Sequence, residues 1–276
     1  MIACCLTTIV EHMESQTLAG RAAIVTGAGG AIGSAIASRL AKAGADVAIV
    51  DRDFTFTAQW GGHASASEIA ALVTAAGQRV VVAEGDAADR SFVESVVARA
   101  ERAFDRVDVL VNCAGGALTP AEDSFASTIS DADLELLFAA NYRSTVNFCQ
   151  SAVPRMRAQG SGSVVNITSG VGHLVPRDGS LAHYLAAKAA VTSYTVSLAN
   201  EIGQYGIRVN AVSPGLVMGP RTAAQAADRG AGREEARERV ALRRFGDPDD
   251  IAKVVEFFAG DLSSYVTGQL LAVTGG

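Results

Sequence analysis

Residues 21–51 hold the pattern that most limits how this chain can fold. An apolar run at 21–26 predicts a buried strand, and after a glycine-rich turn at 27–33 the apolar residues recur at helical spacing as far as Ala43. A second apolar run at 46–51 predicts another strand. Two strands joined by one helix form a βαβ unit, in which the strands lie parallel and the crossover is right-handed.

The same alternation continues along the chain. Further strands are expected at 79–83, 107–112, 163–168, 207–212 and 270–273. Further helices are expected at 67–76, 91–104, 131–157 with an interruption near Pro154, from Tyr184 to about 205, and 248–259. This order predicts an α/β fold with a doubly wound parallel sheet, in a single domain over 21–276. Residues 1–20 are expected to be a flexible extension, since they show no helix or strand period, and an irregular substrate loop is expected near 213–247.

Composition excludes several classes of protein. The net charge is −6, which argues against a nucleic-acid surface, and no apolar stretch is long enough to span a membrane. The apolar start of the chain lacks a basic region and meets Glu11 at once, so a signal peptide is not expected. Cys4, Cys5, Cys113 and Cys149 show neither metal-ligand nor disulfide spacing. We therefore expect free thiols in a cytoplasmic protein, and no metal.

The glycine-rich turn and Asp51 together suggest a dinucleotide site. Glycines between a strand and a helix let a pyrophosphate approach the N–H groups of the helix start, although such turns also occur as plain connectors. Asp51, at the end of the second strand, can accept hydrogen bonds from the two ribose hydroxyls of an adenosine, or can be an ordinary turn residue. Trp60 and His63 follow in a long connection, where packing of the loop is favoured over contact with the adenine.

Tyr184 and Lys188 stand four residues apart in an expected helix and so project from one face. An ammonium about 4 Å from a phenol favours the phenolate by roughly 4 kcal/mol at an effective dielectric near 20, before desolvation is subtracted. Tyr184 would then carry protons near neutral pH. The alternative is a tyrosine that packs in the core and a lysine that reaches solvent.

Several separated motifs agree with one family. TGAGGAIG (26–33), NCAG (112–115), Asn141 in AANYRS, Ser169 in VVNITSG, YLAAK (184–188) and VNAVSPG (209–215) stand in the order found in the short-chain dehydrogenase/reductase family. The chain resembles this family over about residues 19–276. The resemblance implies a Rossmann fold, hydride transfer to or from a nicotinamide cofactor, and a homotetramer in which the helices around Asn141 and Tyr184 pack on a neighbour.

The resemblance also assigns roles to residues. Tyr184 is the expected general acid and base, Ser169 holds the substrate oxygen, Lys188 assists Tyr184 and binds the nicotinamide ribose, and Asn141 holds a water that links Lys188 to solvent. The residues expected to bind the cofactor are Gly27, Gly29, Gly30, Ala31, Ile32, Gly33, Asp51, Arg52, Asp86, Ala87, Asn112, Ala114, Gly115, Tyr184, Lys188, Pro214, Gly215 and Val217.

Three positions depart from the family pattern. Ala31 replaces a glycine, and Gly219 stands where a threonine often contacts the nicotinamide, so Thr222 or backbone has to substitute. The segment between Ser169 and Tyr184 is about two residues longer than usual, which leaves the outline of the substrate pocket open.

The expected activity is that of an NAD-dependent alcohol dehydrogenase or ketone reductase. Asp51 favours NAD, and an NADP-dependent carbonyl reductase that uses Arg52 is the alternative. A non-catalytic dinucleotide sensor is a weaker alternative, since it has no need of Ser169, Tyr184 and Lys188. The residues expected to make the substrate pocket apolar are Val171, Leu174, Val175, Leu118 and Met218, and Arg177 or Arg221 could admit an anion.

Overall fold

The computed structural model describes residues 16–55, 65–120, 122–170, 176, 178–220, 222–223 and 234–276. The strands are β1 (Ala22–Thr26), β2 (Asp46–Asp51), β3 (Val80–Glu84), β4 (Val109–Asn112), β5 (Gly162–Ile167), β6 (Ile207–Pro214) and β7 (Leu270–Val273). The main helices are α2 (Ala31–Lys42), α3 (Ala66–Ala75), α4 (Arg90–Phe104), α5 (Asp131–Phe138), α6 (Ser144–Gln159), α7 (Ala182–Ile202), α9 (Glu234–Glu238) and α10 (Pro248–Ala259). Short helical turns lie at Ala139–Arg143, Gly203–Tyr205 and Asp261–Ser263.

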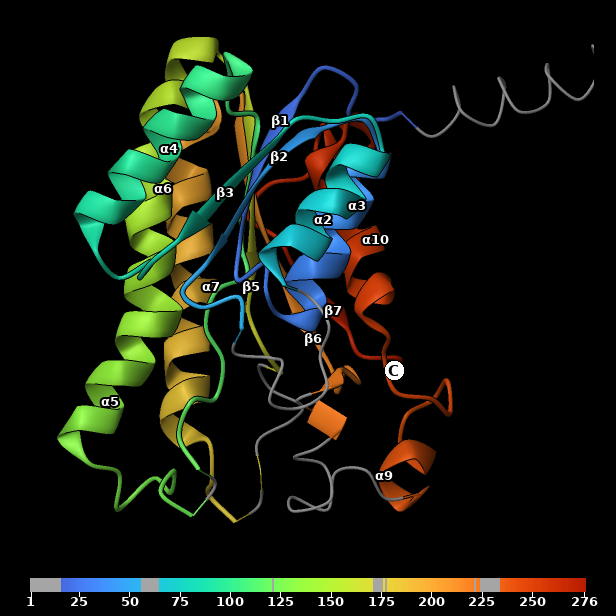
Figure 1. Ribbon diagram of the computed structural model, residues 1–276. Helices are drawn as coiled ribbons and strands as arrows, with labels where there is room; N and C mark the ends of the chain where they lie inside the picture. The colour runs from blue at the N-terminus through green and yellow to red at the C-terminus, as the bar shows by residue number, and fades with distance from the viewer. Residues whose placement is uncertain are drawn as a thin grey trace, which may run out of the picture.

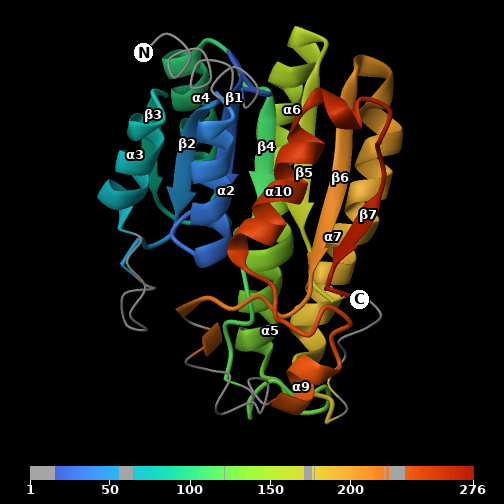
Figure 2. The same ribbon diagram turned by 90° about the vertical axis from the view of Figure 1, so that its right-hand side faces the viewer.

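Within these ranges the strands form one parallel sheet in the order β3-β2-β1-β4-β5-β6-β7, which confirms the predicted doubly wound fold (Figures 1 and 2). β1 pairs with β2 on one side and with β4 on the other side, so the order of the strands reverses at β1. Ligands of such sheets bind beyond the carboxyl ends of the strands where the order reverses. Figure 2 shows the arrowheads of β2, β4 and β6 at the same end of the molecule.

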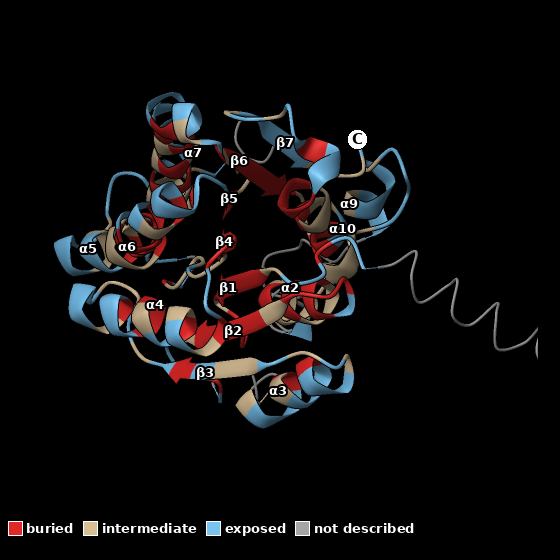
Figure 3. Ribbon diagram, turned by 90° about the horizontal axis from the view of Figure 1, so that it is seen from above, coloured by how far each residue is buried: buried red, intermediate tan, exposed pale blue. Residues whose placement is uncertain are grey.

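Helices cover both faces of the sheet. α2, α3 and α10 lie on one face, and α4, α6 and α7 lie on the other (Figures 1 and 3). All residues of β1 and β4 are buried, which explains why their sequences are continuous apolar runs rather than alternating ones. No helix in the described part of the chain combines the length and the apolar character needed to cross a bilayer.

The helix expected over 131–157 is interrupted at a different place. Pro154 lies inside α6, which continues to Gln159, so the proline costs one backbone hydrogen bond without ending the helix. The interruption is instead a single π-helical turn at Ala139–Arg143. There the Asn141 side chain donates to the Leu137 carbonyl at 2.9 Å, and the Thr145 hydroxyl donates to the Asn141 carbonyl at 3.1 Å. Such turns occur often at functional sites.

The folded domain begins earlier than expected. Leu18 is fully buried, and its N–H donates to the Ala43 carbonyl at 2.8 Å. The boundary of the extension at residue 20 is therefore corrected, because Leu18 belongs to the core, while 1–15 lie outside the described residues. The region expected as an irregular loop near 213–247 contains the short helix α9, and its residues 224–233 are also outside the described ranges.

We predict that Leu18→Ala lowers the free energy of unfolding by about 2–5 kcal/mol, because it leaves a cavity in the core beneath α10 and α2. Urea unfolding followed by circular dichroism measures this loss. Leu72→Ala is the matched control, since Leu72 is 48% exposed and its truncation should change stability by less than about 0.5 kcal/mol. A loss as small for Leu18 as for Leu72 would show that residues 16–20 do not anchor the chain start.

Candidate active site

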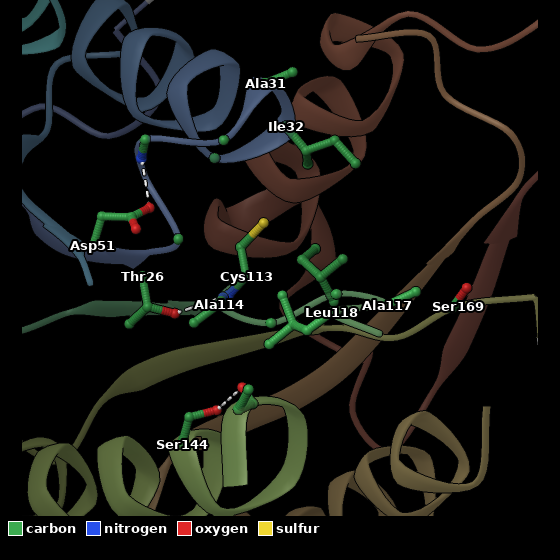
Figure 4. A pocket seen from close by; sticks show the side chains of 18 of the residues that line it. Thr26, Ala31, Ile32, Asp51, Cys113, Ala114, Ala117, Leu118, Ser144 and Ser169 are labelled. Atoms are coloured by element: carbon green, nitrogen blue, oxygen red, sulfur yellow. Dashed lines mark hydrogen bonds between the residues drawn. The ribbon is translucent and has the colours of Figure 1, made fainter. Parts of the chain in front are cut away.

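A cleft of about 700 Å³ opens at the carboxyl ends of the strands, at the point where the strand order reverses (Figure 4). The segments that follow β1 to β6 line it. Parallel strands place all these segments at one edge of the sheet, which is why residues far apart in the sequence meet here.

The turn between β1 and α2 forms one wall. Gly27 has φ 67°, and a Cβ atom there would lie 2.7 Å from the Cys113 carbonyl oxygen. A Cβ atom on Gly33 would lie 2.0 Å from the Gly27 carbonyl oxygen, so the turn and α2 approach too closely for side chains. Gly30 precedes α2 without a side-chain cap, and the first-turn residues Ala31 and Ile32 line the cleft. Uncapped N–H groups at a helix start fit a phosphate group.

Asp51 closes the same end of the cleft. Its Oδ2 accepts a hydrogen bond from the Gly29 N–H at 2.8 Å, and its Oδ1 accepts one from the Asp53 N–H at 3.2 Å (Figure 4). Burial raises the pKa of Asp51, and these N–H groups and that of Arg52 oppose the rise. The carboxylate is thus held against the glycine turn, in the position expected for an acceptor of ribose hydroxyls.

Thr26, at the end of β1, bonds to residues 113–114 at the start of the loop that follows β4. Its Oγ1 accepts hydrogen bonds from the Cys113 and Ala114 N–H groups, each at 3.0 Å. Sequence reasoning did not single out this hydroxyl, although Thr26 opens the TGAGGAIG motif. Gly115 follows with φ 115°, and a Cβ atom there would lie 2.3 Å from Asn141 Oδ1.

Two asparagines support the cleft from behind and do not line it. Asn141 accepts from the Gly116 N–H at 2.8 Å and donates to the Gly116 carbonyl at 3.1 Å, so its amide clamps the β4 loop. Its expected role in holding a water stays a prediction. Asn112, expected to contact the cofactor, is 3% exposed, and its amide nitrogen donates to Asn166 Oδ1 at 2.9 Å. Its side chain lies in the core, because Asn112 is the last residue of β4 and bonds to Asn166 of the neighbouring strand β5.

Ser169, Tyr184 and Lys188 all line the cleft. Lys188 is 4% exposed, and its Nζ donates to the Ile167 carbonyl at 2.9 Å, two residues before Ser169. This bond joins α7 to the end of β5, and so links the helix that carries Tyr184 to the segment that carries Ser169. The alternative of a solvent-exposed lysine does not describe this structure.

Burial sets the electrostatics of this end of the cleft. Desolvation lowers the pKa of Lys188 to about 8, an effect that the Cys113 sulfur opposes. Desolvation also raises the pKa of the Cys113 thiol to about 12. Near neutral pH the cleft therefore holds a buried ammonium group beside a protonated thiol.

Two of the three departures from the family pattern, at positions 31 and 219, meet in space. A Cβ atom on Gly219 would lie 2.7 Å from the Cβ of Ala31, so the glycine leaves room for the alanine. Thr222, expected as a substitute, lines the cleft as Gly219 does.

All other residues expected to bind the cofactor line the cleft. They are Gly27, Gly29, Gly30, Ala31, Ile32, Gly33, Asp51, Arg52, Asp86, Ala87, Ala114, Gly115, Tyr184, Lys188, Pro214, Gly215 and Val217. Of the expected substrate-pocket residues Leu118 lines it and Met218 does not. The residues outside the described ranges are Trp60, His63, Val171, Leu174, Val175, Arg177 and Arg221. Among the described residues no group of three or more His, Cys, Asp or Glu side chains could hold a metal ion.

Comparisons with known proteins agree with this geometry. A family model described as enoyl-(acyl carrier protein) reductase matches residues 27–276. Cyclohexanol dehydrogenase of Rhodococcus sp. strain TK6 is 36% identical over 270 residues, which cover 95% of this chain and 98% of that protein. The 3-oxoacyl-(acyl-carrier-protein) reductase FabG of Staphylococcus epidermidis is 32% identical over 256 residues, 93% of this chain and 98% of that protein.

The crystal structure of the protein gox2181 superposes with a TM-score of 0.84 at 32% identity, and the match covers 96% of this chain and 98% of that one. The fold, the cleft and these relatives define an oxidoreductase of the Rossmann type. The chain belongs to the short-chain dehydrogenase/reductase family, whose members use a nicotinamide cofactor.

We predict that Cys113 resists alkylation although it borders the cleft. At pH 8 the thiolate fraction of a thiol with a pKa of about 12 is roughly 10³ times smaller than that of an ordinary thiol. The thiolate is the form that reacts with the alkylating reagent. Iodoacetamide labelling at pH 8, with mass spectrometry of the peptide that contains Cys113, measures the rate. Labelling in denaturing urea is the control and should be fast. Equally fast labelling of the folded protein would contradict the protonated state of this thiol.

Proposed function

We propose that the protein is an NAD-dependent oxidoreductase that transfers a hydride between a secondary alcohol or ketone and the nicotinamide. The observation that carries this proposal is the placement of Ser169, Tyr184 and the buried Lys188 in the same cleft as Asp51 and the glycine turn. One set of residues suits proton transfer to a substrate oxygen, and the other suits an adenosine diphosphate.

The chemistry of the substrate oxygen follows from these side chains. In the oxidation, Tyr184 takes the hydroxyl proton of the alcohol while the hydrogen on the carbinol carbon leaves as hydride, and the reduction reverses both transfers. The hydroxyl of Ser169 donates a hydrogen bond to the oxygen, which stabilises the negative charge that develops there. The ammonium of Lys188 stabilises negative charge on the Tyr184 oxygen. The bound nicotinamide supplies the hydride acceptor or donor.

Asp51 supports NAD as the cofactor. An ionised carboxylate has about four acceptor positions, so Asp51 keeps capacity for ribose hydroxyls while it accepts from Gly29 and Asp53. A 2′-phosphate at the same place would meet a like charge. Arg52 also lines the cleft and is the observation that favours the alternative, an NADP-dependent carbonyl reductase.

Apolar residues support an apolar substrate. Leu118, Leu181 and Leu216 line the cleft. Cyclohexanol dehydrogenase, the relative at 36% identity, is named for an apolar secondary alcohol. A secondary alcohol or ketone with an alkyl body is therefore the substrate class that we propose.

The assembly and the location are part of the same proposal. The homotetramer expected from the family resemblance is tested by sedimentation velocity, where monomer alone would count against it. Cys113 and Cys149 are free thiols that form no disulfide bond, which supports a reducing compartment such as the cytoplasm. Recovery of the protein in the soluble cytoplasmic fraction tests that location.

We predict that Tyr184→Phe lowers turnover by about 10²–10⁴-fold, because the variant keeps the ring and loses the proton carrier. Absorbance at 340 nm with the best alcohol measures turnover, and fluorescence titration measures NADH affinity, which should change little. Tyr194→Phe is the control, since Tyr194 lies on the same helix and does not line the cleft. Near-normal turnover of Tyr184→Phe would remove the assigned role.

We predict that the wild-type protein has a higher kcat/KM with NAD(H) than with NADP(H). Asp51→Ala should lower the ratio of these two values at least tenfold, because the variant loses the acceptor of ribose hydroxyls and leaves Arg52 able to bind a 2′-phosphate. The control is Glu84→Ala, an acid at the end of the neighbouring strand that does not line the cleft. A wild-type preference for NADP(H) would establish the alternative. An unchanged ratio in Asp51→Ala would place the discrimination elsewhere.

A further inference from the structure

Leu181 has a left-handed backbone conformation, with φ 60° and ψ 12°. A leucine pays a steric cost in this conformation that glycine does not, because its Cβ approaches a carbonyl oxygen. Among the described residues, Asp105 and Arg243 are the other non-glycine residues with a positive φ, and neither lines the cleft, whereas Leu181 does. Backbone strain that persists at a site has to be held by its surroundings, and it points to a function.

The loop between β4 and α5 makes one hydrogen bond to Leu181 and another to Gly179, two residues before it. The Leu181 N–H donates to Ser124 Oγ at 3.2 Å, and Ser124 is 2% exposed. The Ala126 N–H donates to the Gly179 carbonyl at 3.1 Å. The Leu181 carbonyl in turn accepts the Leu185 N–H at 2.9 Å, in the first turn of α7. The catalytic helix therefore starts from a residue that the β4 loop fixes in place.

The side chain of Leu181 belongs to the reacting end of the cleft. Leu181 immediately precedes α7, which carries Tyr184 and Lys188, and it lines the same cleft as these two residues and Ser169. Asp51 and the glycine turn occupy the other end. Leu118, from the loop after β4, also lines the cleft and lies near Ala117 in Figure 4.

We propose that Leu181 contacts the alkyl body of the substrate and sets a preference for bulky over small secondary alcohols and ketones. The left-handed backbone is the means by which a leucine at the start of α7 faces the cleft. Ser124 acts as a positioning residue, since its hydroxyl holds the Leu181 N–H. This inference rests on the proposed alcohol dehydrogenase function and names the residue that selects within that substrate class.

The test compares kcat/KM for cyclohexanol with kcat/KM for 2-propanol, which has the same reacting group and less alkyl surface. Leu181→Ala and Leu181→Gly should each lower the ratio of the cyclohexanol value to the 2-propanol value about tenfold, because a pocket contact selects by the apolar surface it covers. Leu181→Gly should melt at a higher temperature than Leu181→Ala, since glycine accepts the left-handed backbone. Ser124→Ala should lower the ratio of the cyclohexanol value to the 2-propanol value as well. Ser124→Thr keeps a hydroxyl and should keep the wild-type ratio.

Asp105→Gly and Asp105→Ala are the matched controls. Asp105 has the same backbone conformation, with φ 66°, at the end of α4 and outside the cleft. The glycine variant should again melt higher than the alanine variant, and the ratio of the two alcohols should not change. If wild-type protein turns over both alcohols and the Leu181 variants keep its ratio, the inference fails while the proposed function stands. If wild-type protein turns over no alcohol or ketone with either cofactor, both fail.

Discussion

The site depends on one buried cation. An ammonium group taken out of water loses several kcal/mol of solvation, and only a well-placed acceptor makes its burial tolerable. The Ile167 carbonyl supplies that acceptor to Lys188 at the end of β5. Because β5 is bonded to strands on both sides, the carbonyl is held firmly. The bond therefore ties α7, which carries Tyr184, to the end of β5, which leads into Ser169.

The sequence predicted the parts of the structure that follow from period and from the ends of strands. Continuous apolar runs predicted strands buried on both faces, and their strict alternation with helices predicted the parallel sheet. Once the sheet is parallel, residues that follow its strands have to meet at one edge, so Asp51, Ser169 and the glycine turn could be grouped without coordinates. The spacing of four residues between Tyr184 and Lys188 predicted that both side chains project from one face of a helix.

The remainder depends on contacts that no local pattern encodes. Pro154 reads as a helix break, yet tertiary packing keeps α6 intact, and the actual irregularity lies at Asn141, whose amide bonds to the Gly116 backbone. Asn112 is the last residue of β4, and its amide donates a hydrogen bond to Asn166 in the core instead of lining the cleft. A left-handed leucine has no sequence signal, so Leu181 could not be found. Leu18 falls in the predicted extension because a single apolar residue shows no helix or strand period.

The contact between Ala31 and Gly219 restricts the order in which this cleft can change. The Cβ of Ala31 fills the space that a side chain at position 219 would need. A larger residue at 219 is therefore blocked while Ala31 is present, whereas glycine at 31 first removes the obstruction and leaves position 219 free to vary. The two positions therefore constrain each other, and a side chain at 219 is expected to cost less stability when position 31 is glycine than when it is alanine.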